Sequence, residues 1–484
     1  MTGIQDPVVD KDTSSSTIAE KKKTIYIIGA GWYGVHTALQ LAKEGKYHVI
    51  LIEKNEKLFS ELSGQCGVRL HQGLHYPRSP RTREACREGY EEFIKLYPDL
   101  MVEHDYSIYA LGKEPDALKY PSKVSKDEFT RVCKSEYPES KSIDPDDYGY
   151  KGLHMAQEIT EDSIKGGSEL HAYFEPKLRE AGVELRYGTT VDALNKLENG
   201  QIKVIIGESS ETADSVVNAT GFQALLPSKN EPLPFNMQVK YQSCLIFLYE
   251  DTKPTSDKPF SFIVMDGAYP CIMPYGYGRC DPQHSSPMYL LYHAQYTILG
   301  SADDQQGAKA ISDKFIGFSE EQKREYRKNF EDAINIFWPD FDQRFKPIGY
   351  KVFNLAKIQC DKEFRSTVSF SRGGVIYIVP GKINDIQSIY KDVSALIKKE
   401  KILNEGTYFY RKGSSLDLGQ NEIRETPKDG YFNTCSLQSL HDFELKQQEI
   451  HKIKHTTNNM TLFPFAKKNP EDHSNRPQFP FSLP

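Results

Sequence analysis

Three glycines and one acid near the start of the chain have the types and the spacing that a nucleotide site requires. Gly29, Gly31 and Gly34 follow a β-branched run as Gly-x-Gly-x-x-Gly, and Glu53 ends the next apolar run. The first glycine allows a tight turn, the second lets the backbone approach a pyrophosphate, and the third lets a helix pack against a strand. The Glu53 carboxylate can accept hydrogen bonds from ribose hydroxyls, which argues against a 2′-phosphate. Residues 24–54 therefore predict a strand, turn, helix and strand that bind a dinucleotide.

The loop that follows, residues 63–77, carries side chains suited to acid-base chemistry and anion binding. His71 is our first candidate for a base or a neighbour of the cofactor, because imidazole titrates near neutral pH, and His75 is the second. An anionic substrate needs a paired cation, and guanidinium suits bidentate recognition, so three arginines are candidates: Arg69, Arg78 and Arg279. Tyr275 and Tyr292 could line the pocket. Structural roles stay open for all of them, such as a histidine bonded within a glycine loop, a solvated arginine or a tyrosine packed in a sheet.

Length and composition exclude several classes of protein. The chain has 484 residues, a net charge of −6 and a hydrophobic fraction of 38%, a balance that favours neither nucleic-acid nor membrane-surface binding. No apolar run approaches the roughly 18 residues of a spanning helix. Residues 1–22 are polar and lack the core of a signal peptide, so we expect a disordered leader and a cytoplasmic protein. The eight cysteines show no metal-ligand spacing, so we expect reduced thiols and no metal site.

The remaining patterns indicate helices and strands that would position these residues. Apolar residues recur at helical spacing in three segments: 79–96, 167–182 and 319–337. Short β-rich pieces separated by Pro and Gly fill 105–153 and 233–299, and the second of these indicates an antiparallel sheet. A strand, a glycine turn and a helix follow from Gly373, which repeats the opening unit in a looser form. The last 84 residues give weak signals, with a helix suggested over 437–453 and disorder after it.

Three separated segments together resemble the FAD-dependent oxidoreductases of the D-amino-acid oxidase type. They are IIGAGWYG to LIEK (27–54), SVVNATGF (215–222) and GGVIYIVPGKINDI (373–386). The 63–77 loop resembles the His-x-Gly-x-x-Tyr stretch of the branch that contains L-2-hydroxyglutarate oxidase and glycerol-3-phosphate dehydrogenase, with three matching positions: His71, Gly73 and Tyr76. Gln65 and Cys66 depart from the His and Asn usual there, so the substrate of that branch is not carried over.

The resemblance implies an α/β fold with a discontinuous Rossmann-like FAD-binding domain and an inserted antiparallel-sheet substrate domain. The FAD-binding domain would take 23–104, 154–228 and 360–400, the substrate domain 105–153 and 229–359, and a partly disordered C-terminal extension 401–484. Cofactor contacts are expected from Gly29, Gly31, Trp32, Tyr33, Gly34, Glu53, Lys54, Gly73, Thr220, Gly221, Gly381, Lys382 and Ile383. The backbone N–H groups of the last three would lie near the flavin N1/C2=O edge, where negative charge grows on reduction.

The activity that the resemblance implies is oxidation of a CH–NH or CH–OH bond by hydride transfer to flavin N5, with oxygen or another acceptor reoxidising the flavin. We expect a small anionic substrate and catalytic residues among His71, His75, Arg69 and Arg279. Some members of the wider family attach the flavin covalently through a histidine in this region, which makes His71 a candidate attachment point as well.

Two alternatives remain open. A flavin monooxygenase or a non-redox flavin enzyme predicts dependence on NAD(P)H or on prior flavin reduction. A non-catalytic protein that keeps the FAD fold as an interaction scaffold predicts absent FAD, or FAD that no substrate reduces. The chain has no second strong Gly-x-Gly-x-x-Gly, which argues against a separate NAD(P)H domain, and no Gly-Gly pair after Glu53 of the kind found in monoamine-oxidase-like enzymes.

Overall fold

The computed structural model describes residues 22–65, 68–113, 122–221, 232–265, 267, 269–275, 286–359, 364–424 and 440–448. Two compact units are distinguished, Met1–Ser439 and Leu440–Pro484. In the second unit the described residues, 440–448, are helical, within the segment where the sequence suggests a helix. All elements named below belong to the first unit.

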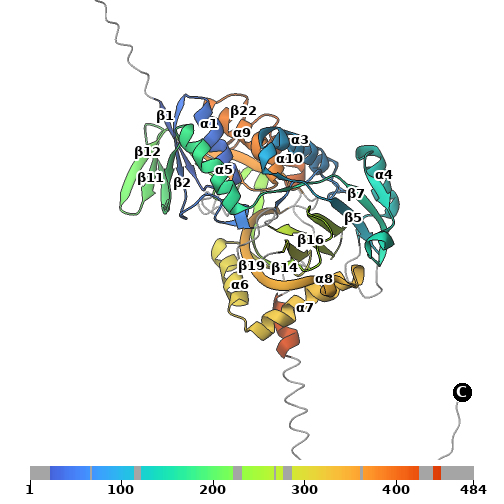
Figure 1. Ribbon diagram of the computed structural model, residues 1–484. Helices are drawn as coiled ribbons and strands as arrows, with labels where there is room; N and C mark the ends of the chain where they lie inside the picture. Colours follow the sequence, from blue (N-terminus) through green and yellow to red (C-terminus); the bar gives the residue numbers. More distant parts are fainter. Residues whose placement is uncertain are drawn as a thin grey trace, which may run out of the picture. The chain divides into compact units, whose positions relative to one another are not determined.

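The first unit is built on a mainly parallel sheet of eight strands (Figure 1). In order across the sheet they are β22 (Ile402–Glu405), β23 (Tyr408–Arg411), β20 (Val368–Arg372), β21 (Val375–Val379), β13 (Ser215–Asn218), β1 (Lys23–Ile28), β2 (Tyr47–Ile52) and β9 (Glu184–Arg186). The five strands from β21 to β9 are parallel. The sheet therefore joins the three sequence segments that carry the resemblance.

Strand β1 shows why its sequence is apolar without alternation. Ile25 and Ile27 pack into the core on one face of the sheet, and Tyr26 and Ile28 pack into a second core on the other face. A strand buried on both faces needs a continuous apolar run. The first core also holds the apolar residues of α1 (Trp32–Lys43), α5 (Gly167–Glu180) and α9 (Ile386–Lys398), and α1 packs against both other helices.

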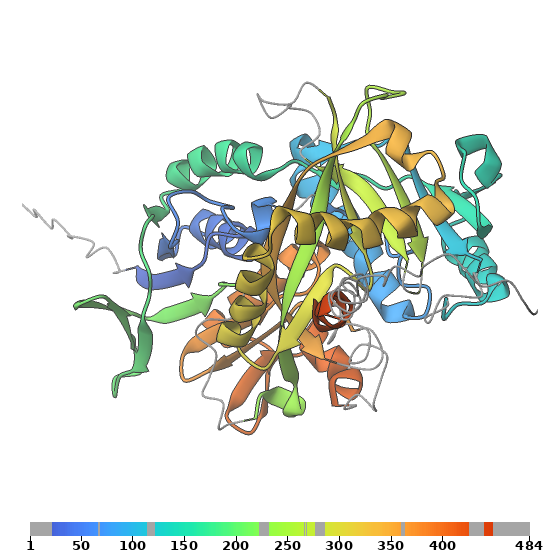
Figure 2. The ribbon, with the colours of Figure 1, turned by 90° about the horizontal axis from the view of Figure 1, so that it is seen from below.

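The second large sheet has nine strands and holds most of the β-rich segments. They are β18 (Ile298–Ala302), β14 (Gln238–Asp251), β17 (Met288–His293), β16 (Pro270–Tyr275), β15 (Phe260–Met265), β5 (Tyr106–Gly112), β7 (Leu153–Ile159), β6 (Lys141–Ile143) and β19 (Phe345–Gln359), which pairs with β14. All pairs are antiparallel except β15 with β5. Helix α6 (Gln305–Ile316) packs on β14, β18 and β19, and α7 (Glu320–Phe337) packs on β16 and β17 (Figure 2).

Smaller elements complete the unit. Two three-stranded sheets contain β10 (Ala193–Lys196), β11 (Ile202–Ile206) and β12 (Ser209–Ala213), and β3 (Val68–Arg69), β8 (Ser163–Ile164) and β4 (Met101–Val102). The other helices are α2 (Leu62–Gln65), α3 (Pro80–Leu96), α4 (Lys126–Glu136), α8 (Phe341–Arg344) and α10 (Ser415–Arg424), with 3-10 turns η1 (Pro98–Leu100), η2 (Pro145–Tyr148), η3 (Pro234–Asn236) and η4 (Ile383–Asp385).

The α/β fold class predicted from the sequence is confirmed. The helices expected over 79–96, 167–182 and 319–337 appear as α3, α5 and α7, and the Ser79 hydroxyl accepts the Thr82 N–H at 3.3 Å to cap α3. Residues 401–424, expected within a C-terminal extension, contribute β22 and β23 to the antiparallel end of the eight-stranded sheet. The domain boundaries stay a prediction. Within the described ranges, no helix is long and apolar enough to cross a membrane.

Candidate active site

A cavity of about 940 Å³ lies at the carboxyl ends of β1, β2 and β13, and we call it the trough. It is lined by the Gly29–Tyr33 turn, by Glu53 and Lys54, by Ala219–Gly221 and by the Pro380–Ile383 loop, and on its other side by residues of α6 and β19. Its volume falls within the range of about 300–1,000 Å³ that is typical of ligand sites. The carboxyl edge of parallel strands is also where α/β sheets bind ligands.

The glycines of the turn are fixed by close backbone contacts. Gly29 has φ +98°, and a Cβ there would lie 2.7 Å from the Ala219 carbonyl oxygen. A Cβ on Gly34 would lie 1.8 Å from the Gly29 carbonyl oxygen, and one on Gly31 would lie 2.8 Å from the Ser63 hydroxyl oxygen. No side chain fits at Gly29 or Gly34, so the N-terminus of α1 opens onto the trough through bare backbone. A helix N-terminus of this kind suits a pyrophosphate.

Glu53 ties the end of β2 to this turn. Its Oε2 accepts the Ala30 N–H at 2.8 Å, and its Oε1 accepts the N–H and the side-chain amide of Asn55 at 3.0 and 2.7 Å. The residue is 8% exposed and lines the trough. Because a carboxylate oxygen can accept more than one hydrogen bond, Glu53 can still take one from a ribose hydroxyl.

The other expected cofactor residues differ in position. The trough lining includes Trp32, Tyr33, Lys54, Thr220, Gly221, Gly381, Lys382 and Ile383. The Trp32 ring, however, packs in the core against the rings of Phe59, Phe93, Tyr97 and Phe174. Gly73 lies outside the described lining of the trough: its φ is +107°, and a Cβ there would lie 2.7 Å from Cα of Arg83 in α3. Its role is to let the 71–76 loop pack on that helix.

A hydrogen-bond network fixes the Pro380–Ile383 loop under the trough. The Gly381 N–H donates to Thr367 Oγ1 at 3.0 Å, and the Tyr33 hydroxyl contacts Thr367 Oγ1 at 2.6 Å and donates to the Lys382 carbonyl at 2.8 Å. The buried Asp385 carboxylate accepts the Thr367 N–H at 2.6 Å. Burial raises the pKa of Asp385 to about 6, against hydrogen bonds that lower it. The loop is therefore held in one conformation from both sides.

Arg69 is buried, and it is paired with an acid. Its Nε lies 3.1 Å from Oε2 of Glu161, and both side chains are almost fully enclosed, with 1% and 0% exposure. Glu161 also accepts the Gln72 N–H at 2.7 Å and the Tyr109 hydroxyl. The Arg69 guanidinium lies 5.2 Å from the centre of the Tyr109 ring. This pair crosses from β3 to the loop before β8 and fixes the strand that precedes the two histidines.

His71 and His75 lie side by side, with ring centres 5.4 Å apart. His71 lines both the trough and a second cavity, and His75 lines the second cavity. Burial lowers the pKa of both histidines well below the usual value, and the charges of Lys382 and Arg69 lower it further. Both rings are thus neutral near neutral pH. The Asn384 amide donates to the His71 carbonyl at 2.8 Å and ties this loop to the loop under the trough.

The second cavity, of about 510 Å³, we call the inner cavity. It shares eight lining residues with the trough: Leu62, His71, Tyr292, Leu355, Ala356, Pro380, Gly381 and Lys382. Its other walls come from β14, β15, β16, β17 and β19 and from residues 364–366. A ligand that extends along the trough to this boundary therefore presents its end to the inner cavity.

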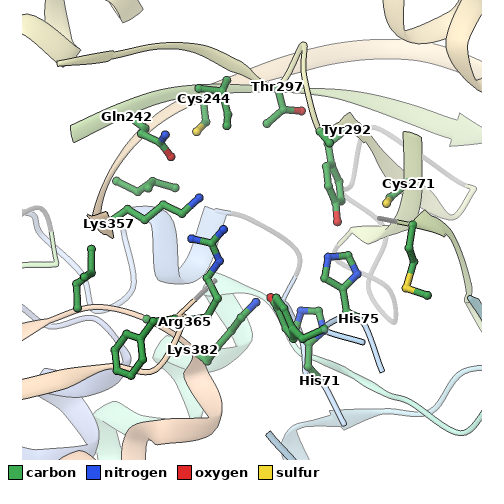
Figure 3. A pocket seen from close by; sticks show the side chains of 18 of the residues that line it. His71, His75, Gln242, Cys244, Cys271, Tyr292, Thr297, Lys357, Arg365 and Lys382 are labelled. Atoms are coloured by element: carbon green, nitrogen blue, oxygen red, sulfur yellow. The ribbon is translucent and has the colours of Figure 1, made fainter. Parts of the chain in front are cut away.

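The described lining of the inner cavity contains five cationic side chains and no Asp or Glu. They are Arg78, Lys123, Lys357, Arg365 and Lys382. Figure 3 shows Lys357 and Arg365 on one side of the cavity and His75 and Tyr292 on the other, with Lys382 beside His71 between them. Burial raises the pKa of the Tyr292 hydroxyl well above its usual value and that of the Cys271 thiol to about 11, so both stay protonated. The cavity suits a ligand with negative charge.

The predicted catalytic residues are brought together in part. His71, His75, Tyr292 and Arg78 line the inner cavity, and Arg69 lines the trough. Tyr275 lies outside both described linings, where Lys351 Nζ is 5.7 Å from its ring centre. Arg279 lies outside the described residues. Three further lining residues are not among those predicted from the sequence: Lys357, Arg365 and Gln242. Of these, Gln242 had a detectable signal, an amide within an otherwise apolar strand, and it is 7% exposed.

The fold and the two joined cavities define a dinucleotide-dependent enzyme of the α/β class. Residues 24–348 match the model of a family described as FAD dependent oxidoreductase. The chain is 38% identical over 421 residues to a protein of Aspergillus flavus named FAD-dependent monooxygenase kojA, which covers 85% of this chain and 96% of that protein.

Two solved structures share the fold. One is NikD, an unusual amino acid oxidase of nikkomycin biosynthesis, with a TM-score of 0.58, 16% identity, and coverage of 78% of this chain and 94% of that one. The other is L-α-glycerophosphate oxidase from Mycoplasma pneumoniae with FAD bound, with a TM-score of 0.57, 10% identity, and coverage of 84% and 99%.

The chain belongs to the family of FAD-dependent oxidoreductases of the D-amino-acid oxidase type. Its cofactor is FAD, and the residues present fit that group: bare backbone at the N-terminus of α1, an acid at the end of β2, and a trough that reaches the inner cavity. Membership in this family of enzymes overturns the alternative of a non-catalytic scaffold.

Proposed function

We propose that this protein oxidises a CH–OH or CH–NH bond of a small anionic substrate bound in the inner cavity. The observation that carries the proposal is the shared boundary of the two cavities, where His71, Tyr292 and the Pro380–Lys382 loop line both. When bound, FAD supplies an acceptor for the hydride of the substrate C–H bond. Among the described residues, the linings of the two cavities meet at that boundary, so a substrate in the inner cavity would reach a cofactor in the trough across it.

The charge of the inner cavity supports an anionic substrate. Lys357 and Arg365 lie on the wall opposite His75 in Figure 3, so a carboxylate or phosphate held there would direct the rest of the molecule toward the histidines. Lys382 lies between the two groups, with its Nζ 4.5 Å from the centre of the Tyr76 ring. Binding at a remote anionic group is what fixes the reacting bond in place, and orientation of this kind lowers the barrier by several kcal/mol.

The neutral histidines support proton transfer in the same step. Oxidation of an alcohol or amine carbon requires that the hydroxyl or amine proton also leave, and a neutral imidazole can accept it. His71 and His75 are neutral because burial and the neighbouring cations Arg69 and Lys382 lower their pKa. Their proximity to the boundary therefore supports one of them as the base.

An anaerobic flavin titration tests the proposal. Purified FAD-loaded protein is mixed with lactate, alanine and N-methylalanine, each beside its neutral amide or ester analogue, and the flavin absorbance is followed. We expect one acid to bleach the flavin and its uncharged counterpart to do so at least about tenfold more slowly, the loss of one charge-assisted contact. Bleaching by no member of an extended panel of 2-hydroxy and amino acids, or equal rates with the uncharged analogue, would contradict the proposal.

A monooxygenase reaction is the second candidate, because the Aspergillus flavus relative carries that name. Such a reaction needs an external reductant before oxygen reacts. Oxygen consumption with an acid substrate present therefore separates the two: consumption without NADH or NADPH supports the oxidase reaction, whereas a strict requirement for either nucleotide supports the monooxygenase.

A further inference from the structure

The hydrogen bond between Arg69 and His71 determines which ring nitrogen of His71 carries hydrogen. Arg69 Nη2 lies 3.4 Å from His71 Nδ1. A guanidinium has five N–H donors, no acceptor, and stays protonated in proteins. His71 Nδ1 must therefore be the acceptor, and in the neutral ring the hydrogen is on Nε2. The His71 ring, which lines both cavities, is left with an N–H donor for their contents.

The position of Arg69 is itself fixed by buried partners. Glu161 Oε2 lies 3.1 Å from Arg69 Nε, and Glu161 is held by the Gln72 N–H at 2.7 Å and by the Tyr109 hydroxyl. The Arg69 side chain is 1% exposed, and neither its Nε nor its Nη1 has a hydrogen-bond partner among the described residues, so the contact with Glu161 is an ion pair. Enclosure and this ion pair hold the guanidinium in place, with its Nη2 directed at His71.

In the part of the chain that the structure describes, His75, unlike His71, has no hydrogen bond that fixes its tautomer. No described group hydrogen-bonds to its buried Nδ1. The groups that face its ring are the rings of His71, Tyr76 and Tyr109 and, through their charges, Arg69, Lys382 and Arg365. In Figure 3 the hydroxyl of Tyr292 also points toward it. None of the hydrogen bonds described here fixes its tautomer, so His75 is free to exchange a proton with a ligand.

We propose that the Glu161–Arg69 pair fixes His71 as the Nε2–H tautomer, a hydrogen-bond donor at the boundary of the cavities, and that His75 is the base. Glu161 and Arg69 are positioning residues in this account. The assignment of His75 rests on the proposed function, whereas the tautomer of His71 does not. The two roles expected of His71 in the sequence, base and neighbour of the cofactor, are thereby divided between the two histidines.

The proton balance of the step is simple. The proton on the substrate oxygen or nitrogen moves to an unprotonated ring nitrogen of His75, the C–H bond gives up its hydride to the oxidised cofactor, and a C=O or C=N bond forms. His71 gains and loses no proton. Its Nε2–H donates to an acceptor atom throughout, and its pKa, lowered by burial and by Lys382 and Arg69, keeps the ring neutral.

NMR spectroscopy of the FAD-loaded protein with ¹⁵N-labelled histidine tests the tautomer without any substrate. The signals of the two residues are assigned with His71→Gln and His75→Gln. We expect one His71 tautomer, with hydrogen on Nε2, from about pH 6 to 8, on either side of the usual histidine pKa. Hydrogen on Nδ1, or a protonated ring, would overturn the proposal. Arg69→Met is expected to give a mixture of tautomers, and the wild-type spectrum alone decides if that variant does not fold.

The rate of flavin reduction, measured by stopped flow with an acid that bleaches the flavin, tests the base. We expect His75→Gln to slow reduction by about 100-fold or more, as for loss of a general base, and to remove the acid limb of the pH profile. His71→Gln, which keeps an N–H donor, is expected to slow it less than about tenfold, the worth of one weak hydrogen bond. The reverse order would overturn the assignment. If no acid bleaches the flavin, the proposed function and the His75 assignment both fail, whereas the NMR result stands separately.

Discussion

The trough and the inner cavity meet at one boundary but are built from different parts of the polypeptide. The trough is formed largely by backbone: a glycine turn, the N-terminus of α1 and the Pro380–Ile383 loop, each close to the end of a parallel strand. The inner cavity is formed by side chains from β14, β15, β16, β17 and β19 and from two loops. The cofactor can be held by fixed backbone geometry, whereas the proposed substrate would be recognised by side chains.

The constraint on sequence differs accordingly between the two cavities. In the trough, Gly29 and Gly34 have no room for a Cβ, and the carbonyl of one lies where the Cβ of the other would be. In the inner cavity, Gln242 and Cys244 lie two positions apart on β14 and both face the cavity, so the contact there is made by side chains. Substitutions should therefore act on cofactor content in the first region and on substrate in the second.

The largest effect is expected from Gly34→Ala in the trough. The added Cβ would lie 1.8 Å from the Gly29 carbonyl oxygen, so the turn and α1 must separate. We expect loss of stoichiometric FAD, measured by flavin absorbance relative to protein absorbance after purification. The matched control is Gly349→Ala on β19, where nothing lies within 4 Å of the added Cβ. Full flavin content in Gly34→Ala would refute the account of the trough.

The next largest effect is expected on stability, from Arg83→Met. This variant acts on the loop of residues 71–76, which carries the two histidines. Arg83 is 1% exposed, bonds to Glu136 at 2.9 Å and to the Tyr76 carbonyl at 3.1 Å, and so supports the loop that carries His75. Loss of these hydrogen bonds from a buried guanidinium, roughly 1.5–3 kcal/mol for each charge-assisted one, should lower the free energy of unfolding by about 3–5 kcal/mol. Urea denaturation measures it.

Arg87→Met is the matched control for this variant, because Arg87 contacts the same Glu136 carboxylate at 2.7 Å but is 35% exposed. Its cost should stay near 1 kcal/mol or below, the value of an exposed ion pair. If both variants lower the free energy of unfolding equally, the loop of residues 71–76 does not depend on Arg83.

A pH effect is expected from Asp385, under the trough. Its folded pKa of about 6 exceeds the unfolded value of 3.8, so its favourable contribution is complete below pH 3.8 and is lost as the pH rises through 6. The loss amounts to about 3 kcal/mol at 1.36 kcal/mol per pKa unit. We therefore measure the free energy of unfolding between these pH values. It should fall by this amount in the wild type but not in Asp385→Asn. If the variant keeps the wild-type dependence of the unfolding free energy on pH, the titrating group is another acid, such as Asp392.

The smallest expected effect is on ligand affinity in the inner cavity. Lys357→Met should weaken binding of propionate, an anionic probe, by about tenfold, the equivalent of about 1.4 kcal/mol for one charge-assisted contact. Perturbation of the flavin spectrum measures the dissociation constant, and flavin content should stay unchanged. Lys346→Met on the exposed end of the same strand is the control with the same loss of charge. Equal weakening in both variants would indicate a long-range charge effect rather than a site.

The sequence was sufficient for the trough because its determinants are local. Gly29, Gly34 and Glu53 lie within one strand-turn-helix-strand unit, so their spacing alone specifies which atoms meet. Trp32 and Gly73 show the limit of that argument. Both are predicted to contact the cofactor. Trp32 lines the trough while its ring packs in the core, and Gly73 lies outside the described lining and packs on α3, because the packing of helices on the sheet decides both positions.

The inner cavity could not be predicted from the sequence to the same degree. Lys357 and Arg365 reach it because β14 pairs with β19 in a specific register and because residues 364–366 follow that strand. Register of this kind depends on contacts between residues 94 to 121 positions apart, and no short motif encodes it. His71 and His75 were found from their residue type, but the role of Arg69 as partner of Glu161 required the fold.

The crystal structure of the FAD-loaded protein would test the central claim most directly, because it shows where the flavin ring lies relative to both cavities. We expect the pyrophosphate at the N-terminus of α1 and the flavin ring at the shared boundary, in contact with His71, Tyr292 or the Pro380–Lys382 loop. A flavin ring that lies away from that boundary, with the inner cavity closed off from it, would contradict the account.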